Sequence, residues 1–193
     1  DKGNRVQNNI ENDTGTPEET KLLWDKSLKL AQEYLKEGGS YYVNSMQGGD
    51  LLLLLSLKEA GLELKHSLVW VKNNHVLGRS DYNYKHELIL YGWKKGASHH
   101  FYSDFDVSVW EVNKPLRNEL HPTMKPIELL SKAIKNSSKV KEIVLDLFGG
   151  SGSTLIACEQ LNRKCFMMEI DPVYVQIIID RWEKLTGKTS IKV

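Results

Sequence analysis

The chain has 193 residues, of which 40% are hydrophobic and 26% are charged, and its formal net charge is +1. This composition fits one globular domain with a buried core. No apolar run reaches the roughly 18 residues of a membrane span, and the first residues lack the apolar segment of a signal peptide. We therefore expect a cytoplasmic protein, while the net charge argues neither for nor against a nucleic-acid partner.

The cysteines and histidines predict neither a disulfide framework nor a metal site. Cys158 falls in a helical pattern and Cys165 in a strand pattern, so both are expected to be core thiols in a reducing compartment. The pair His99–His100 has no cysteine or acidic cluster at ligand spacing around it, and we expect a surface pair and no metal.

Taken in chain order, the pattern begins with a polar, aperiodic stretch at residues 1–16, interpreted as an exposed loop or a cut end. Thr16-Pro17 then predicts a helix start, and Gly38-Gly39 predicts its end. Asp50 is expected to cap a second helix. After the first helix the expected elements are a strand at 40–43, a helix at 50–60, strands at 64–71 and 87–93, a helix at 126–137, a buried strand at 142–147, a helix at 153–161, a strand at 164–169 and a helix at 172–185.

The last four elements alternate strand, helix, strand, helix. This order predicts parallel strands with helices on both faces, as in a doubly wound, Rossmann-like α/β fold. We expect residues 1–193 to form a single domain. The two polar stretches 72–85 and 94–120 are expected to be surface loops of that domain, the second with one short strand.

The sharpest feature is an apolar strand that ends at Asp146 and runs into the glycine-rich turn Phe148–Thr154, with Glu169 at the end of the following strand. Glycines let a backbone pass close under a ligand, and a strand-terminal acid can hold a ribose diol. A phosphate-binding loop would need a lysine after the last glycine. A dinucleotide site would need a third glycine where Leu155 stands, so an NAD oxidoreductase is a lesser alternative. A purely structural alternative is a tight turn in which Asp146 caps the following helix. S-adenosylmethionine has no phosphate, and its ammonium suits Asp146.

Two motifs carry a family resemblance. Residues 146–154 read DLFGGSGST and residues 121–126 read HPTMKP. In this order they resemble the cofactor motifs of the beta-class DNA amino-methyltransferases, with Leu147 in place of the usual proline. The resemblance implies a methyltransferase fold in circularly permuted order. It also implies transfer of a methyl group from S-adenosylmethionine to adenine N6 in DNA, with cytosine N4 as the alternative, in a restriction-modification setting.

The resemblance further implies roles for individual residues. Thr123 and Lys125 would close over the methionine tail, Asp146 would meet its ammonium, Glu169 would hold the ribose, and Asp171 would reach the adenine end. The full expected cofactor site is His121, Pro122, Thr123, Lys125, Asp146, Phe148, Gly149, Gly150, Ser151, Gly152, Ser153, Thr154, Glu169 and Asp171.

The family's catalytic tetrad, Asp-Pro-Pro-Tyr or Ser-Pro-Pro-Tyr, is absent from the chain. The nearest match, Asp171-Pro172-Val173-Tyr174, has the wrong third residue and is explained as a helix start. The family order places the tetrad and its central strand just before Asp1, so we expect that strand to be missing, with exposed sheet edges and poor stability alone. A catalytically inactive fragment that binds cofactor and DNA is therefore a second hypothesis.

DNA is the expected partner, and a homodimer is left open. The loops 72–85 and 94–120 mix cations, amides and aromatics, which suits phosphate contacts and base stacking. The second loop is short, so the DNA target sequence is expected to be short as well. The expected DNA-binding residues are Lys72, Asn73, Asn74, Arg79, Lys114 and Arg117.

Overall fold

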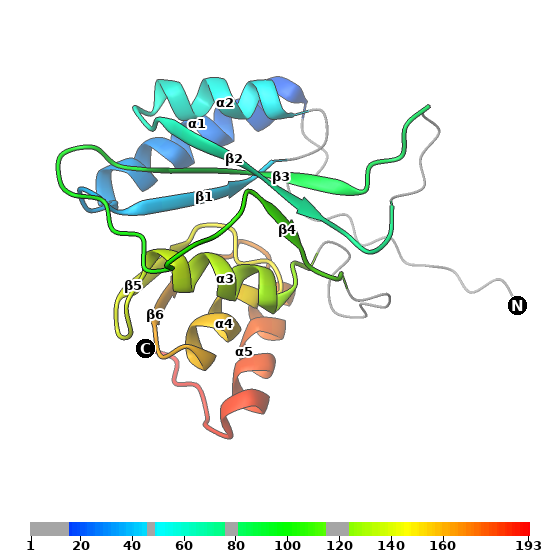
Figure 1. Ribbon diagram of the computed structural model, residues 1–193. Coiled ribbons are helices and arrows are strands. Elements are labelled where there is room, and N and C mark those ends of the chain that lie inside the picture. Colours follow the sequence, from blue (N-terminus) through cyan, green and yellow to red (C-terminus); the bar gives the residue numbers. More distant parts are fainter. Residues whose placement is uncertain (1–15, 46–48, 76–80, 115–123) are drawn as a thin grey trace, which may run out of the picture.

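The structure is a computed structural model that describes residues 16–45, 49–75, 81–114 and 124–193. Its helices and strands alternate in layers (Figure 1). In chain order they are α1 (Pro17–Tyr34), β1 (Ser40–Asn44), α2 (Asp50–Glu59), β2 (Leu64–Val71), β3 (His86–Trp93), β4 (Val109–Glu111), α3 (Ile127–Ser137), β5 (Ile143–Asp146), α4 (Ser153–Gln160), β6 (Lys164–Met167) and α5 (Pro172–Thr186).

Among the described residues the strands form two sheets. The larger sheet has the order β1-β3-β2-β4, in which β3 is antiparallel to β1 and β2, and β4 is parallel to β2. The smaller sheet pairs β5 with β6 in parallel. The parallel β5–α4–β6 unit and the mixed α/β architecture confirm the predicted fold class.

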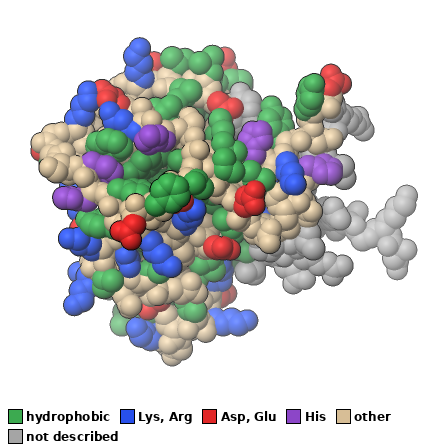
Figure 2. Space-filling model, in the orientation of Figure 1, with side chains coloured by type: hydrophobic (Ala, Val, Ile, Leu, Met, Phe, Trp, Pro, Cys, Tyr) green, Lys and Arg blue, Asp and Glu red, His purple; other side chains and the backbone are tan. Residues whose placement is uncertain are grey.

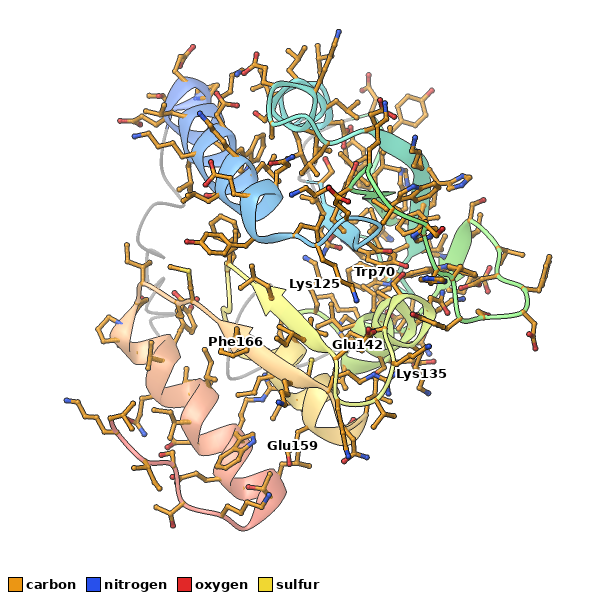
Figure 3. The ribbon with its side chains drawn as sticks, turned by 90° about the vertical axis from the view of Figure 1, so that its left-hand side faces the viewer. Trp70, Lys125, Lys135, Glu142, Glu159 and Phe166 are labelled. Atoms are coloured by element: carbon orange, nitrogen blue, oxygen red, sulfur yellow. The ribbon has the colours of Figure 1, made fainter. Side chains whose placement is uncertain are left out.

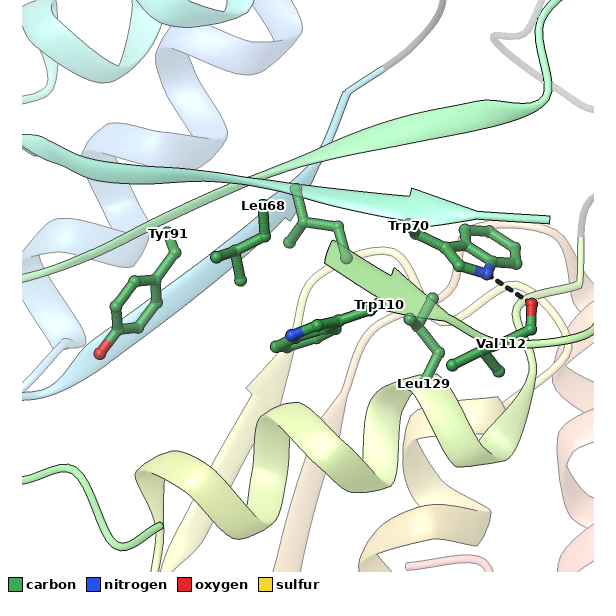
Figure 4. Packing of buried hydrophobic residues seen from close by; sticks show 7 residues of the cluster. Leu68, Trp70, Tyr91, Trp110, Val112 and Leu129 are labelled. Carbon is green, nitrogen blue, oxygen red and sulfur yellow. Dashed lines mark hydrogen bonds between the residues drawn. The ribbon is translucent and has the colours of Figure 1, made fainter. Parts of the chain in front are cut away.

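Helices cover both faces of the larger sheet (Figure 1). Alternate residues of a strand point to opposite faces, so Leu90 packs among the leucines of α1 and α2, while its neighbours Ile89 and Tyr91 face the other way. On that second face lie Trp70 and Leu129, the latter from α3 (Figure 4). These two apolar clusters hold the sheet between its helix layers.

Helix α3 connects the two sheets. Its Leu129 belongs to the core of the larger sheet, and its Ile134 packs against Ala157 and Cys158 of α4 on the smaller one. Because α3 leads back into β5 through a short turn, the start of α3 lies at the same edge as the carboxyl end of β5. This geometry brings the segment around Lys125 to the edge where the glycine turn begins.

One prediction about β5 is wrong. The strand was expected to be buried, yet Ile143 is 63% and Leu145 is 45% exposed, and Phe166 on β6 is 58% exposed. Only the opposite face of this strand pair, with Val144 and Cys165, packs against helices. Helices on both faces therefore hold for the larger sheet but not, among the described residues, for β5–β6.

The outer edges of β1 and β5 have no strand partner within the part of the chain that the structure describes. The expectation of a missing central strand remains a prediction. The same described residues contain no helix long and apolar enough to cross a membrane.

The start of α2 also differs from expectation. Gly49 occupies the cap position and Asp50 is already the first helical residue. The carboxylate of Asp50 accepts a hydrogen bond from the Ser45 hydroxyl, which ties the end of β1 to the helix. By contrast, the predicted cap of α1 is confirmed, because the Thr16 hydroxyl accepts from the backbone N–H of Glu19 at 3.2 Å.

Candidate functional site

The glycine turn joins β5 to α4 and folds back onto the end of β6. The N–H of Gly149 donates to the carbonyl of Met168 at 2.8 Å, and the N–H of Gly152 donates to the carbonyl of Gly149 at 2.8 Å. Gly150 and Gly152 have φ values of +53° and +78°, in the left-handed region that glycine adopts without strain. The turn is thereby held tightly, and it leads into the first turn of α4, whose N–H groups have no acceptor within the helix.

The two strand-terminal acids meet in this turn. The Glu169 carboxylate accepts three backbone N–H groups, from Gly150 at 2.6 Å, Ile170 at 2.9 Å and Asp171 at 3.0 Å. A carboxylate can accept about four hydrogen bonds, so it keeps acceptor capacity for a hydroxyl. Glu169 thus fixes the turn and still offers an acceptor beside it.

Asp146, at the end of β5, is the second acid of the turn. Burial raises the pKa of Asp146, and the nearby charge of Glu169 acts in the same direction, while the Thr154 hydroxyl and the Phe148 N–H, at 3.0 Å, lower it by hydrogen bonding. Within the part of the chain that the structure describes, no cation faces this largely desolvated carboxylate, which is an incomplete arrangement. The site therefore suits a ligand that brings a positive charge to Asp146.

The remaining predicted residues of the turn differ in their contacts and in their exposure. The Ser151 carbonyl accepts from the Arg181 guanidinium, Phe148 is 58% exposed at the rim, and the buried Ser153 hydroxyl has no hydrogen-bond partner among the described residues. Asp171 caps α5, because its side chain accepts from the Val173 N–H at 2.8 Å. The structure brings together all predicted cofactor residues from Asp146 to Asp171.

Gly152 offers a test of how tightly the turn is built. A Cβ there would lie 3.0 Å from Ile178, in a left-handed conformation. Gly152→Ala is expected to cost about 2 kcal/mol of unfolding free energy, because the backbone strain of 1–2 kcal/mol adds to the clash. Urea unfolding measures this loss.

Gly61 is the matched control, since it has a φ of +75° and nothing within 4 Å of its would-be Cβ. Gly61→Ala should lose only the backbone part, about 1 kcal/mol. Equal losses in the two variants would contradict the close packing of the turn against α5.

A second polar cluster lies beside Trp70. The Glu87 carboxylate, on β3, binds the Lys72 ammonium at 2.6 Å through one oxygen and the Lys125 ammonium at 3.0 Å through the other. Both ammonium groups lie over the Trp70 ring, at 5.4 and 5.8 Å from its centroid. The register explains the pairing, because Trp70 and Glu87 are opposite each other on β2 and β3.

This cluster corrects the prediction for Lys72. It was expected to contact DNA, but its side chain is only 4% exposed and is paired with Glu87. Asn73 and Asn74 are exposed, and the Asn73 side chain accepts from the backbone N–H of Lys114 at 2.9 Å, which ties loop 72–75 to the end of β4. Asn74 and the half-buried Lys114 thus remain candidates for DNA contacts, and Asn73 has a structural contact as well.

Five predicted residues lie outside the described part of the chain. They are His121, Pro122, Thr123, Arg79 and Arg117. On the face visible in Figure 2, lysine and arginine side chains form scattered small groups rather than one continuous stripe. The described residues also contain no cluster of three or more His, Cys, Asp or Glu that could hold a metal ion.

The sequence analysis did not predict two residues of these polar clusters, Glu87 and Arg181. An acid at the start of an otherwise apolar strand is the signal that the sequence offers for Glu87, while its place opposite Trp70 comes from the register of the two strands. Arg181 lies on α5, and only the folded structure shows that it reaches the glycine turn.

An α/β sheet with a glycine turn between parallel strands and an acid after the second strand defines a nucleoside-binding protein of the Rossmann-like class. The comparisons with known proteins narrow this class. A family model described as DNA methylase matches residues 4–180. The chain belongs to this DNA methylase family.

The curated relatives include M2.DpnII of Streptococcus pneumoniae, a type II methyltransferase that is 26% identical over 175 residues, covering 82% of this chain and 65% of the relative. M.Cfr9I of Citrobacter freundii, also a type II methyltransferase, is 32% identical and covers 67% of this chain and 47% of the relative. The chain thus spans less than two thirds of the length of these two relatives.

Among solved structures, the complex of M1.HpyAVI with SAM superposes with a TM-score of 0.71 at 26% identity, covering 81% of this chain and 80% of that one. The cytosine-N4-specific PvuII DNA methyltransferase superposes with a TM-score of 0.75 at 18% identity, covering 89% and 76%. The second likeness shows the shared fold alone.

Proposed function

We propose that this chain is the cofactor-binding and DNA-facing part of a DNA amino-methyltransferase that moves a methyl group from S-adenosylmethionine to adenine N6. The observation that carries the proposal is that the carboxylates of Asp146 and Glu169 both lie on the glycine turn, where they accept the N–H groups of Phe148 and Gly150. The name of the M1.HpyAVI–SAM complex and the DNA methylase family support the choice of cofactor and substrate.

The described residues fit this cofactor. The half-buried Asp146 would take its ammonium, and the remaining acceptor capacity of Glu169 would take a ribose hydroxyl. The Ser153 hydroxyl, which has no partner within the described ranges, would add a further polar contact. Gly149 packs closely against the end of β6, since a Cβ there would lie 2.8 Å from the Met167 side chain, so the turn has a fixed position beside this site. Bound S-adenosylmethionine supplies an electrophilic methyl on a sulfonium, and the chain's task is to hold that group in place and exclude water.

The amine of adenine is a weak nucleophile that needs hydrogen-bond acceptors at its protons and a base flipped out of the helix. The chain contains no Asp-Pro-Pro-Tyr or Ser-Pro-Pro-Tyr sequence to supply those acceptors. A binding fragment without methyl-transfer activity is therefore the second candidate function. Cytosine N4 remains the alternative target for the complete enzyme.

Two measurements test the proposal. Calorimetric titration with S-adenosylmethionine, S-adenosylhomocysteine and NAD is expected to show binding of the first two only. Transfer of labelled methyl to duplex DNA, followed by nucleoside analysis, separates N6-methyladenine from N4-methylcytosine and both from no product. Binding without transfer favours the fragment, and absence of binding to both sulfur nucleosides by the folded chain would refute the proposal.

The pH dependence of cofactor binding is a further prediction. Only an ionised Asp146 can pair with an ammonium, and burial raises its pKa. Affinity for S-adenosylmethionine is therefore expected to fall as the pH drops through this raised pKa, at a higher pH than for an ordinary aspartate. Calorimetry in a descending pH series measures this, and proton release on binding should accompany it.

Asp146→Asn is the control for this prediction. The variant should bind weakly at neutral pH, and its affinity should no longer change with pH over that window. A pH profile that is the same in the wild-type protein and the variant would assign the titration to another group.

A further inference from the structure

Helix α5 packs closely against the glycine turn and against α4. Ile178 of α5 is buried, and a Cβ at Gly152 would lie 3.0 Å from its side chain. One turn further along α5, the Trp182 indole donates to the Glu159 carboxylate of α4 at 3.1 Å, and Figure 3 shows Glu159 between the two helices. These two contacts give α5 a fixed position beside the turn.

Arg181 connects this helix to the turn by a hydrogen bond. Its guanidinium donates to the carbonyl of Ser151, a residue that is itself buried. The Arg181 side chain is partly buried, and burial lowers the pKa of its guanidinium. Among the described residues no carboxylate pairs with it. The contact that Arg181 gains when it leaves water is therefore the backbone of the glycine turn.

Neither helix dipole accounts for the position of Arg181. Lys184 is the basic residue of the last turn of α5, where a cation is favourable, and Arg181 lies before that turn. The guanidinium reaches Ser151, just before the start of α4, and a positive charge is unfavourable at that end of a helix. The contact with the glycine turn, and not the stability of either helix, thus explains the arginine.

The peptide unit between Ser151 and Gly152 is bonded on both sides. Its carbonyl accepts from Arg181, and its N–H donates to the Gly149 carbonyl at 2.8 Å. Gly149 in turn donates to the Met168 carbonyl at the end of β6. Because glycine has little steric preference, the orientation of this peptide depends on its hydrogen bonds. Arg181 is the partner that comes from outside the β5–β6 unit.

We propose that Arg181 is a positioning residue that holds the glycine turn, through the Ser151 carbonyl, in the conformation that binds S-adenosylmethionine. This inference rests on the proposed function. A glycine-rich turn has many accessible conformations, and the affinity of a ligand falls with the fraction of molecules in the binding-competent one. Arg181 raises that fraction from the side of α5, without contacting the cofactor.

Arg181→Met tests this role, because methionine keeps part of the side-chain volume and removes the donor. The affinity for S-adenosylmethionine is expected to fall about tenfold, as for loss of one charge-assisted hydrogen bond. Arg181→Lys keeps a charged donor without the planar fork of the guanidinium, so it should lose only about threefold. Calorimetric titration of the wild-type chain and both variants measures these affinities.

Hydrogen exchange separates positioning from general stability. In the free Arg181→Met chain the amides of Gly149 and Gly152 should exchange about tenfold faster than in the wild-type chain, while the amides of β3 exchange as before. Saturating S-adenosylmethionine should restore their protection, because the bound ligand selects the same turn conformation. A purely structural role would instead speed exchange throughout the chain, and the ligand would not reverse this selectively at the turn.

Lys184→Met is the matched control. Lys184 lies on the same helix and is exposed. The substitution removes one positive charge from α5, as Arg181→Met does, so it should leave both the affinity and the exchange at the two glycines unchanged. Circular dichroism and urea unfolding show whether each variant is folded, and Arg181→Lys carries the comparison alone if Arg181→Met is not.

Three results would overturn the inference. Unchanged affinity in both Arg181 variants would show that the turn keeps its conformation without the guanidinium. An equal loss in Lys184→Met would assign the effect to the charge of α5. Lower affinity with unchanged exchange at Gly149 and Gly152 would mean that Arg181 acts on the cofactor directly. Failure of the wild-type chain to bind S-adenosylmethionine would instead refute the proposed function, while exchange in the free chain would still report whether Arg181 holds the turn.

Discussion

Glu169→Gln is expected to weaken S-adenosylmethionine binding about 100-fold, which corresponds to about 2.8 kcal/mol. The carboxylate accepts the N–H groups of Gly150, Ile170 and Asp171. A glutamine has one oxygen and an NH₂ group, so it leaves at least one of these donors facing another donor, at a cost of about 1–3 kcal/mol. The turn loosens and the ribose acceptor loses its charge at the same time, and calorimetry measures the combined loss.

Glu142→Gln is the control at the opposite end of the β5–β6 strand pair. Glu142 precedes β5, accepts the backbone N–H of Lys139 at 2.7 Å and pairs with Lys36 at 3.0 Å. Its replacement removes a comparable carboxylate contact far from the turn, so cofactor affinity should not change. If both variants lost affinity alike, the effect would come from the β5–β6 pair as a whole and not from the carboxylate at the turn.

The sequence predicted the local features well because local rules govern them. Hydrophobic periodicity together with Thr16 and Pro17 located α1, and the glycines at 149–152 located the turn between β5 and α4. The acid Glu169 was found because a strand end and a carboxylate are both visible in sequence. Family membership was also anticipated, since the two motifs that suggested it are short and contiguous.

The features that were missed depend on pairing across the sheet. Lys72 follows an apolar strand and precedes a polar loop, a pattern typical of a surface cation, and its burial depends on Glu87 from the neighbouring strand. The face of β5 that carries Ile143 and Leu145 was predicted to be buried, but it is exposed. An apolar sequence pattern shows which side chains are hydrophobic, but it does not show which other element covers them. Side-chain partners far apart in sequence are set by register, which single-sequence patterns do not supply.

Trp70→Ala is expected to destabilise the chain by about 3–5 kcal/mol, the usual range for removing a buried large aromatic. Trp70 is 0% exposed and packs in the cluster of Trp110 and Leu129 between the larger sheet and α3. Its indole N–H donates to the Val112 carbonyl at 2.8 Å (Figure 4). Trp70→Phe keeps most of the packing but leaves that carbonyl without its donor, for about 1–3 kcal/mol.

Urea unfolding measures the free energy of unfolding of each Trp70 variant, and Trp182→Phe is the control variant. The Trp182 indole also donates a hydrogen bond, to Glu159 at 3.1 Å, but near the surface, where water replaces the lost partner. Its loss should be under about 1 kcal/mol. A loss for Trp70→Phe no larger than this would contradict a buried, obligatory bond. The ammonium groups of Lys72 and Lys125 lie over the Trp70 ring, and phenylalanine makes a weaker cation–π contact than tryptophan. Trp70→Phe should therefore also weaken cofactor binding, by an amount that reflects this loss.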